Sequence, residues 1–415
     1  MVKYLIERHK IFLRTLKHHF LCLISELFRS DLNNNDPVII FIRRGARSRI
    51  YNHALSLKPH DIKSILIAQT FDYPYHKKVF EKVFPWYRIT DISKKVNKLT
   101  KKYNVISVIS SLQPAAQTIE LLNQDAQYPL LIDHHDSAWS QVFFQDLEIN
   151  DQENNWINTK EVELEKKCFN SVDGVIARSN ELKELFSRNF ITTPTEVFED
   201  CCSDQYFQPI VHTNKPRDQD WSVAYAGMVF PSSHSPEYSF PQFMSLAPIF
   251  NEEKIHFHIY PGQNHEYLYP DYESESKSNM YFHMKRSMSF IKIRKELTQY
   301  DFGLVAFNPP NNYKMFSKEH FKHIIHAKFH TYLEAGLPII VSPVFEREAE
   351  IILKANAGIV FDSETPKGLR QMIEQEDIEQ MRKNVGELRN SFNAASQGRR
   401  LFSFIQDVQE KYKQS

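Results

Sequence analysis

The chain has 415 residues and a mass of 49.0 kDa, with 42% apolar and 25% charged residues. These proportions are ordinary for a folded globular protein and exclude a disordered, collagen-like or disulfide-rich chain. At about 150 residues per domain, the length predicts two or three domains. Glycine is scarce, with 10 residues, so each one is expected where the backbone needs its freedom.

The 51 basic and 51 acidic residues cancel over the whole chain but are unevenly distributed. Residues 1–104 contain 21 basic and 8 acidic side chains, a net charge of +13, whereas residues 105–205 contain 6 and 18, a net charge of −12. The basic block predicts either a solvated surface or contact with an anionic partner such as a membrane surface. No nucleic-acid recognition motif accompanies it, so nucleic acid is not expected as a partner.

Cysteine usage and hydropathy indicate the compartment. The four cysteines show no CxxC spacing, so we expect reduced thiols, no zinc site and a cytoplasmic protein. No apolar run reaches about 18 residues, so no transmembrane helix is expected. Residues 3–29 have the spacing of an amphipathic helix, which packs on its own domain or lies at a membrane interface. If this helix lies at a membrane interface, we expect residues 1–104 to contact the inner membrane face peripherally.

From residue 37 onward, short apolar runs alternate with helical stretches. Continuous apolar runs are typical of strands in a sheet that is covered on both faces. Helices are expected between them, at Tyr75–Phe84, Asp91–Tyr103, Ala115–Asp125 and Asn180–Asn189. The candidate strands are Val38–Ile42, Ser64–Ala68, Val105–Ser110, Leu130–Asp133, Gly174–Ala177 and Glu196–Phe198.

The pattern restarts after a polar stretch at Phe207–Asp220. Residues 264–279 are polar and are expected to form a loop, and Leu401–Lys413 a last helix. We therefore predict an α/β protein with two Rossmann-like, doubly wound parallel-sheet domains. Its parts would be an N-terminal amphipathic helix (1–36), a first domain (37–206), a second domain (207–395) and a C-terminal helix (396–415). The new strands are Ser222–Ala226, Lys254–Ile259, Met280–His283, Asp301–Phe307, Pro338–Val341 and Gly358–Phe361.

The most informative segment runs from His326 to Asp362. A helix is expected from about Lys328 to Glu334, ended by Gly336 and Pro338 and followed at once by a buried strand. The amino end of a helix favours anions, and a lysine there adds a full positive charge. The segment is thus either a diphosphate site or an ordinary helix preceded by a surface lysine.

The segment 327–340 (AKFHTYLEAGLPII) resembles the donor-binding region of GT-B glycosyltransferases, especially the retaining family 4, whose pattern is P-x-K-x-x-E-Y-x-A-x-G-x-P-V-I. Four further segments match that family's order: IDHHD at 132–136, SVDGVIARS at 171–179, YAGMV at 225–229 and YDFGL at 300–304. The resemblance covers residues 38–390. It implies two domains that face a cleft and a nucleotide-diphosphate sugar as donor.

The resemblance also implies which residues bind the donor. The family often has two glutamates eight positions apart, where this chain has His323 and Thr331. A threonine hydroxyl bonds a ribose more weakly than a carboxylate does. The implied donor-binding residues are Lys328, Thr331, Tyr332, Gly227, His283, His326 and Glu334.

Polar residues after two strands of the first domain are candidates for the acceptor side. Asp133-His134-His135-Asp136 follows an apolar strand, where a histidine beside a carboxylate can handle a proton. We predict His135, His134 and Asp136 as catalytic, with a helix cap as the alternative, and the pattern does not distinguish the two histidines. After the first strand, Arg44, Gly45 and Arg47 are the candidate acceptor or phosphate loop, with Gly45 permitting a tight turn.

These features together predict a glycosyltransferase that moves a sugar from a nucleotide-diphosphate sugar to a polysaccharide or lipid-linked acceptor. The resemblance implies retention of configuration and no metal or other cofactor, since positive charge and helix N-termini can stabilise the leaving diphosphate. The only DxD match, Asp218-Gln219-Asp220, precedes a strand and is interpreted as a loop. The alternatives are a degenerate nucleotide-sugar-binding subunit of an active transferase, or another GT-B enzyme such as a sugar-nucleotide epimerase.

Overall fold

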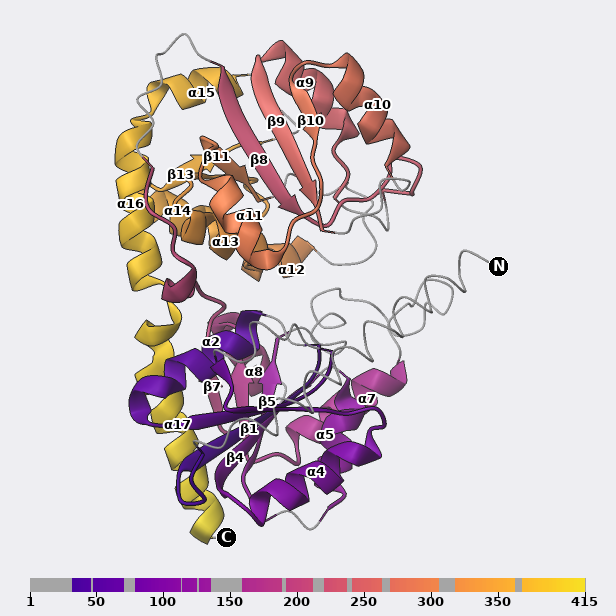
Figure 1. The fold of residues 1–415 in the computed structure, drawn as a ribbon, viewed down its shortest axis with the longest axis vertical. Helices are drawn as coiled ribbons and strands as arrows, with labels where there is room; N and C mark the ends of the chain where they lie inside the picture. Colours follow the sequence, from indigo (N-terminus) through magenta and orange to yellow (C-terminus); the bar gives the residue numbers. More distant parts are fainter. Residues whose placement is uncertain are drawn as a thin grey trace. The chain divides into compact units, whose positions relative to one another are not determined.

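The chain forms two compact α/β units in the computed structural model (Figure 1). The first comprises the chain up to Asp200 together with Ala394–Ser415, and the second is Cys201–Asn393. The structure describes residues 32–45, 48–70, 79–112, 114–124, 127–135, 159–188, 192–211, 220–236, 241–262, 269–305, 318–362 and 368–414.

The first unit is built on a seven-stranded sheet with the order β3-β2-β1-β4-β5-β6-β7. All neighbouring strands are parallel. The order reverses between β1 and β4, which is the point where doubly wound sheets bind ligands. The strands are β1 (Pro37–Gly45), β2 (Lys63–Thr70), β3 (Lys82–Pro85), β4 (Asn104–Ser111), β5 (Leu130–His134), β6 (Gly174–Ala177) and β7 (Thr195–Val197).

Helices cover both faces of this sheet because both faces are apolar. Val38, Ile40 and Ile42 of β1 pack into one core with side chains of α4, α5, α7 and α8. On the opposite face, Phe41 stacks against His53 of α2. The helices are α2 (Ser48–Leu57), α4 (Thr90–Thr100), α5 (Ala115–Leu122), α7 (Thr159–Phe169), α8 (Asn180–Arg188) and α17 (Ala394–Gln414).

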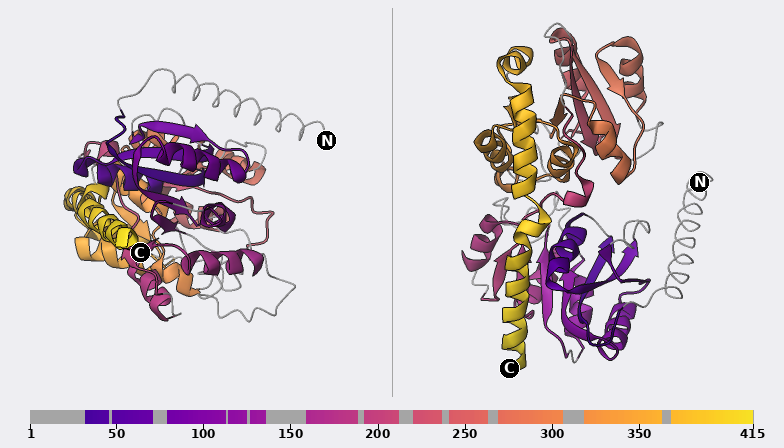
Figure 2. Two further views of the ribbon diagram at one scale, coloured as in Figure 1. Left: turned by 90° about the horizontal axis from the view of Figure 1, so that it is seen from below. Right: turned by 60° about the vertical axis from the view of Figure 1, so that its left-hand side comes forward.

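The C-terminal helix α17 belongs to the first unit and packs along α2 (Figure 2). The close approach depends on Gly398, where an added Cβ would lie 2.2 Å from the Ser56 carbonyl oxygen. Because no real Cβ tolerates such a contact, only glycine allows α17 to lie this near α2.

The second unit repeats the design with a six-stranded parallel sheet in the order β10-β9-β8-β11-β12-β13. Its strands are β8 (Trp221–Gly227), β9 (Ile255–Pro261), β10 (Phe282–Met284), β11 (Phe302–Leu304), β12 (Ile339–Val341) and β13 (Gly358–Val360). Its helices are α9 (Ala247–Glu252), α10 (Pro270–Ser278), α11 (Phe290–Leu297), α12 (Lys318–His323), α13 (Ala327–Ala335), α14 (Glu346–Ala355), α15 (Leu369–Gln375) and α16 (Ile378–Ser391).

The predicted fold class of two doubly wound parallel-sheet domains is confirmed, and each proposed strand overlaps a strand of the structure. Two element predictions need correction. The helix expected at Tyr75–Phe84 was extended too far, because residues 82–84 belong to β3, an edge strand that ends in proline. Residues 75–78 of that prediction lie outside the described residues, and Val79 is helical. The loop expected at 264–279 contains helix α10, which is polar on nearly all sides and buries Tyr272. The amphipathic helix predicted at 3–29 lies outside the described residues.

None of the helices that the structure describes is long and apolar enough to cross a membrane.

Candidate functional site

The carboxyl end of β8 in the second unit brings a lysine against a glycine. Gly227 is the last residue of β8, and a Cβ added there would lie 3.0 Å from Cε of Lys328, the second residue of α13. The Lys328 ammonium lies 5.2 Å from the ring centroid of Tyr225. The absence of a side chain at Gly227 therefore lets the lysine approach the end of the strand.

The Lys328 side chain is half-buried. Burial lowers the pKa of Lys328 to about 8, and the nearby Glu348 carboxylate opposes that shift. Among the described residues, none forms a hydrogen bond or close ion pair with the ammonium. A cation that has lost part of its hydration gains strongly from an anionic ligand, since its own solvation is already reduced.

Glu348 and His326 fix the start of α13. The fully buried Glu348 carboxylate accepts the His326 backbone N–H at 2.6 Å and lies 3.0 Å from His326 Nδ1. The His326 ring also meets Phe345 edge-on, with centroids 4.7 Å apart. These contacts anchor the helix end that presents Lys328.

Tyr332 joins the strands beneath the lysine. Its hydroxyl donates to the Leu304 carbonyl at 2.8 Å and accepts the Ala226 N–H at 2.9 Å, which links α13 to β11 and β8. Its ring lies on Gly303, where an added Cβ would be 2.4 Å from Cγ. Tyr332 is fully buried, so its contacts in this structure are structural. The Thr331 hydroxyl donates to the Ala327 carbonyl at 3.1 Å.

Two residues predicted to bind the donor lie elsewhere in the second unit. Glu334 is buried, pairs with Arg294 at 2.5 Å and accepts the Ser203 N–H at 2.8 Å, so its carboxylate is engaged internally. His283 is stacked on His258, with centroids 4.3 Å apart, and its Nε2 lies 2.9 Å from His256 Nδ1. The structure therefore places both side chains outside the Lys328 cluster.

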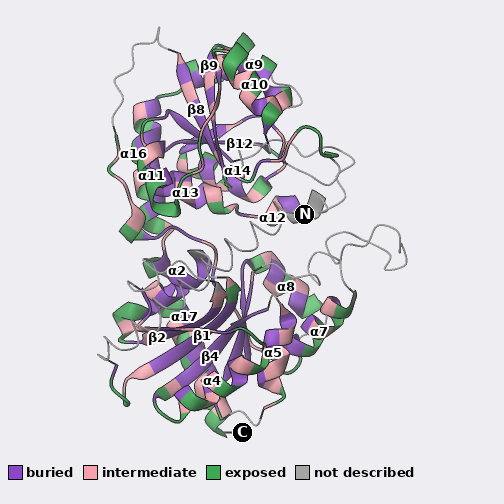
Figure 3. Ribbon diagram, turned by 45° about the vertical axis from the view of Figure 1, so that its right-hand side comes forward, coloured by how far each residue is buried: buried purple, intermediate pink, exposed green. Residues whose placement is uncertain are grey.

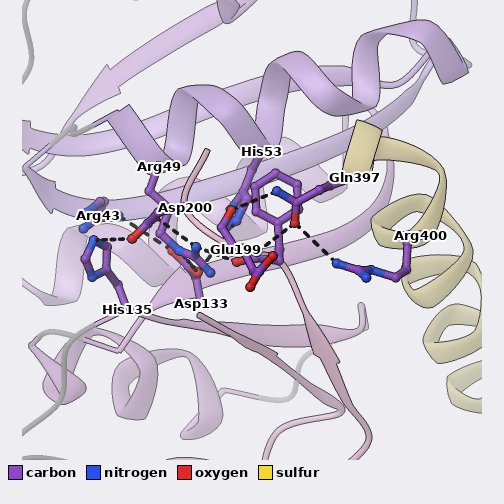
Figure 4. Close-up of polar contacts among 10 residues, drawn as sticks. Arg43, Arg49, His53, Asp133, His135, Glu199, Asp200, Gln397 and Arg400 are labelled. Atoms are coloured by element: carbon purple, nitrogen blue, oxygen red, sulfur yellow. Dashed lines mark hydrogen bonds and ion pairs between the residues drawn. The ribbon is translucent and has the colours of Figure 1, made fainter. Parts of the chain in front are cut away.

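In the first unit, a buried arginine bridges two carboxylates beside His135 (Figure 4). Arg49 Nε donates to Asp133 at 2.8 Å, and its Nη1 donates to Asp200 at 3.1 Å. The second Asp200 oxygen lies 3.5 Å from His135 Nε2. The carboxylate beside His135 is therefore Asp200, which is distant in sequence and which the local motif could not reveal.

Burial and neighbouring charges set the protonation states of the groups in this network. Burial opposes ionisation of Asp133, but Arg49 and other basic neighbours outweigh it and hold the Asp133 pKa at about 2. Burial also lowers the pKa of His53 on α2 to about 3, so this histidine is neutral. His53 stands in no recognisable motif, so the sequence gives no signal for it, whereas Arg49 belongs to the arginine-rich stretch that follows the first strand. Arg43, at the end of β1, lies 3.7 Å from Asp133.

The structure distinguishes the two adjacent histidines. His134 is fully buried, with its ring against Phe169 and Phe186 at 5.6 and 5.1 Å, so its ring is closed to a substrate in this structure. The His135 side chain is 22% exposed and can meet a substrate.

The predicted arginine loop is only partly described. Gly45 pairs with Thr70 as the last residue of β1 and has no positive φ, and the residues that would complete the predicted turn lie outside the described ones. Arg44 is exposed. Asp136 and Arg47 lie outside the described residues. Within the described ranges there is no group of three or more His, Cys, Asp or Glu side chains that could hold a metal ion.

Comparison with known proteins finds a family model and solved structures that this chain resembles. Residues 250–399 match the family model described as glucosyltransferase 3-like, C-terminal domain. Sucrose-phosphate synthase from Thermosynechococcus elongatus is similar in structure, with a TM-score of 0.54 and 12% identity over 91% of this chain and 98% of that one. No curated protein sequence shows significant similarity to the chain.

Two further solved structures share the fold. UGT71G1 from Medicago truncatula, solved with UDP-glucose, has a TM-score of 0.53 and 12% identity over 92% of this chain and 100% of that one. A putative UDP-N-acetylglucosamine 2-epimerase from Listeria monocytogenes has a TM-score of 0.54 and 11% identity over 92% and 98%. The chain therefore has the GT-B fold, and residues 250–399 resemble the glucosyltransferase 3-like family model.

Proposed function

We propose that this protein is a glycosyltransferase that moves a sugar from a nucleotide-diphosphate sugar to a glycan or lipid-linked acceptor. The observation that carries the proposal is the Lys328 ammonium, partly buried at the carboxyl end of β8 and without a bonded partner among the described residues. The matched family model and the fold shared with a UDP-glucose complex support this class of activity.

The donor diphosphate would lie against Lys328 and the first turn of α13. Breaking the sugar–phosphate bond leaves negative charge on the departing diphosphate, and a preorganised cation stabilises that charge in the transition state. The helix N-terminus adds its partial positive charge and unpaired N–H groups. Glu348 acts through His326, because it holds the helix end in place. The Thr331 hydroxyl is placed one turn further along α13 and would meet the ribose.

In the first unit, His135 would contact the acceptor. Asp200 faces its Nε2, and Arg49 holds Asp200 in place. In a retaining reaction without a metal, the leaving phosphate oxygens can take the proton of the acceptor hydroxyl. His135 then mainly positions that hydroxyl, since alignment of reacting groups lowers the barrier.

Isothermal titration with UDP, GDP and ADP tests the donor site. We expect one nucleotide to bind and Lys328→Met to weaken that binding by roughly 10- to 100-fold, as for a lost charge-assisted hydrogen bond. Lys354→Met is the matched control, because Lys354 is an exposed lysine on α14. If none of the three nucleotides binds the wild-type protein, the proposal is wrong.

A sugar-nucleotide epimerase is the second candidate, favoured by the fold shared with the putative epimerase. Mass spectrometry of the products separates the two activities. A transferase releases a nucleoside diphosphate and makes a glycosylated acceptor, whereas an epimerase leaves the nucleotide sugar intact with changed stereochemistry. A protein that binds the donor but turns it over only with a partner protein would be the degenerate subunit instead.

A further inference from the structure

The segment 285–295 of the second unit is strongly basic. Its sequence, KRSMSFIKIRK, contains five basic residues and no acidic residue. It follows strand β10 and continues into helix α11, so it lies at the carboxyl edge of the sheet. Nothing in the proposed transfer reaction accounts for so many cations in so short a segment.

The segment has a buried inner face and an exposed outer face. Ile293 and Leu297 of α11 are buried, and Arg294 is neutralised by its ion pair with Glu334. Ile291, Lys292 and Lys295 are exposed and stand at the i, i+1 and i+4 positions of one helix side.

Large apolar side chains are exposed among the cations. Met288, Phe290 and Ile291 have exposed fractions of 38%, 37% and 46%. Arg286 is also exposed. Figure 3 shows exposed residues along α11, whose other side faces the unit. We call this set of residues the α11 surface: Arg286, Met288, Phe290, Ile291, Lys292 and Lys295.

We propose that the α11 surface docks onto an anionic lipid membrane. Exposed apolar side chains that are surrounded by cations suit the membrane interface, because the apolar groups enter the headgroup–acyl boundary while the cations meet anionic lipids. An acidic protein partner would need a surface of complementary shape, whereas insertion into a membrane does not need one. The docking is independent of the proposed glycosyl transfer and concerns a surface other than residues 1–104.

Vesicle sedimentation with the full-length protein tests the proposal. Phosphatidylcholine vesicles are compared with vesicles that also contain phosphatidylglycerol. Wild-type protein should bind the anionic vesicles, and binding should weaken as salt is added. The double variant Lys292→Gln/Lys295→Gln should weaken binding by about 30-fold, as expected for the loss of two cations near an anionic surface.

A second variant and a matched control keep the test decisive. Met288→Ser/Ile291→Ser should also weaken binding by about tenfold or more, because the insertion of two apolar side chains is lost. Lys277→Gln/Met280→Ser changes the same residue types just before β10, where both side chains are exposed, and should bind as wild type does.

Three results would overturn the proposal. The first is that wild-type protein does not bind anionic vesicles. The second is that the α11 variants bind as well as wild type, which would assign docking to another segment. The third is that the α11 variants lose nucleotide affinity but keep vesicle binding, which would make the surface part of the donor site. Nucleotide titration measures the proposed function separately, so failure of one proposal is not failure of the other.

Discussion

Replacing the buried carboxylate at the centre of the first unit gives the sharpest stability prediction. Asp133→Asn keeps the size of the side chain but removes its charge. The Asp133 and Arg49 side chains are only 4% and 1% exposed, and they are 2.8 Å apart. The substitution therefore leaves a buried guanidinium with Asp200 as its remaining carboxylate partner.

The expected cost follows from burial and charge. Removing one partner of a buried ion pair costs about 3–5 kcal/mol of unfolding free energy. The pH dependence gives an independent estimate, because the folded-state pKa of Asp133, about 2, lies below its ordinary value of 3.8. This stabilisation is present above pH 3.8 and is lost as pH falls towards 2, by about 2 kcal/mol in all.

Urea unfolding of wild type and variant, from pH 7 down to acid, measures this difference. We expect Asp133→Asn to be less stable by about 3–5 kcal/mol at pH 7 and the gap to shrink between pH 4 and pH 2. Glu184→Gln is the control, because its ion pair with Arg188 is exposed and worth at most about 0.5 kcal/mol. A change at Asp133 as small as the control would refute the reasoning.

Three further predictions concern the packing of both units. Gly303→Ala should destabilise the protein by about 1–3 kcal/mol in urea unfolding, because the new Cβ meets the Tyr332 ring, whereas Gly386→Ala in helix α16 should be neutral or stabilising. Tyr332→Phe should cost about 1–3 kcal/mol in the same assay, since it leaves a buried backbone N–H and carbonyl without that partner. Burial of neutral His53 contributes to stability above pH 6.5, and this contribution falls as the pH drops towards the folded-state pKa of His53, about 3. His53→Gln should therefore reduce the loss of unfolding free energy that wild type shows between pH 6.5 and pH 4.

The fold could be predicted because its signals are local. Runs such as Val38–Ile42 are apolar on both faces, and Gly336 ends α13 with a φ of 79°, as its glycine predicts. The errors fall where the local signal is weak. β3 has four residues, and α10 buries one side chain, Tyr272, so neither shows a clear period.

The site was only partly predictable because it is assembled over long distances. Lys328 was found from its place before Gly336, but its contact with Gly227 spans about a hundred residues of chain. Asp200 lies near His135 because the strands that precede them, β7 and β5, belong to the same sheet. No local sequence motif indicates this contact. Glu334 was proposed from the sequence because it lies beside the motif, but in the structure its carboxylate forms an internal ion pair with Arg294.

The most direct test of the central claim, that the Lys328 charge binds the donor diphosphate, is the pH dependence of nucleotide affinity. The Kd of the bound nucleoside diphosphate is measured from about pH 7 to pH 10 in wild type and in Lys328→Arg. The pKa of Lys328 is about 8 in the free protein, so affinity should fall above that pH, by at most about tenfold per pH unit. The arginine variant stays charged and should show no such fall. A wild-type affinity that stays constant over this range would contradict the account.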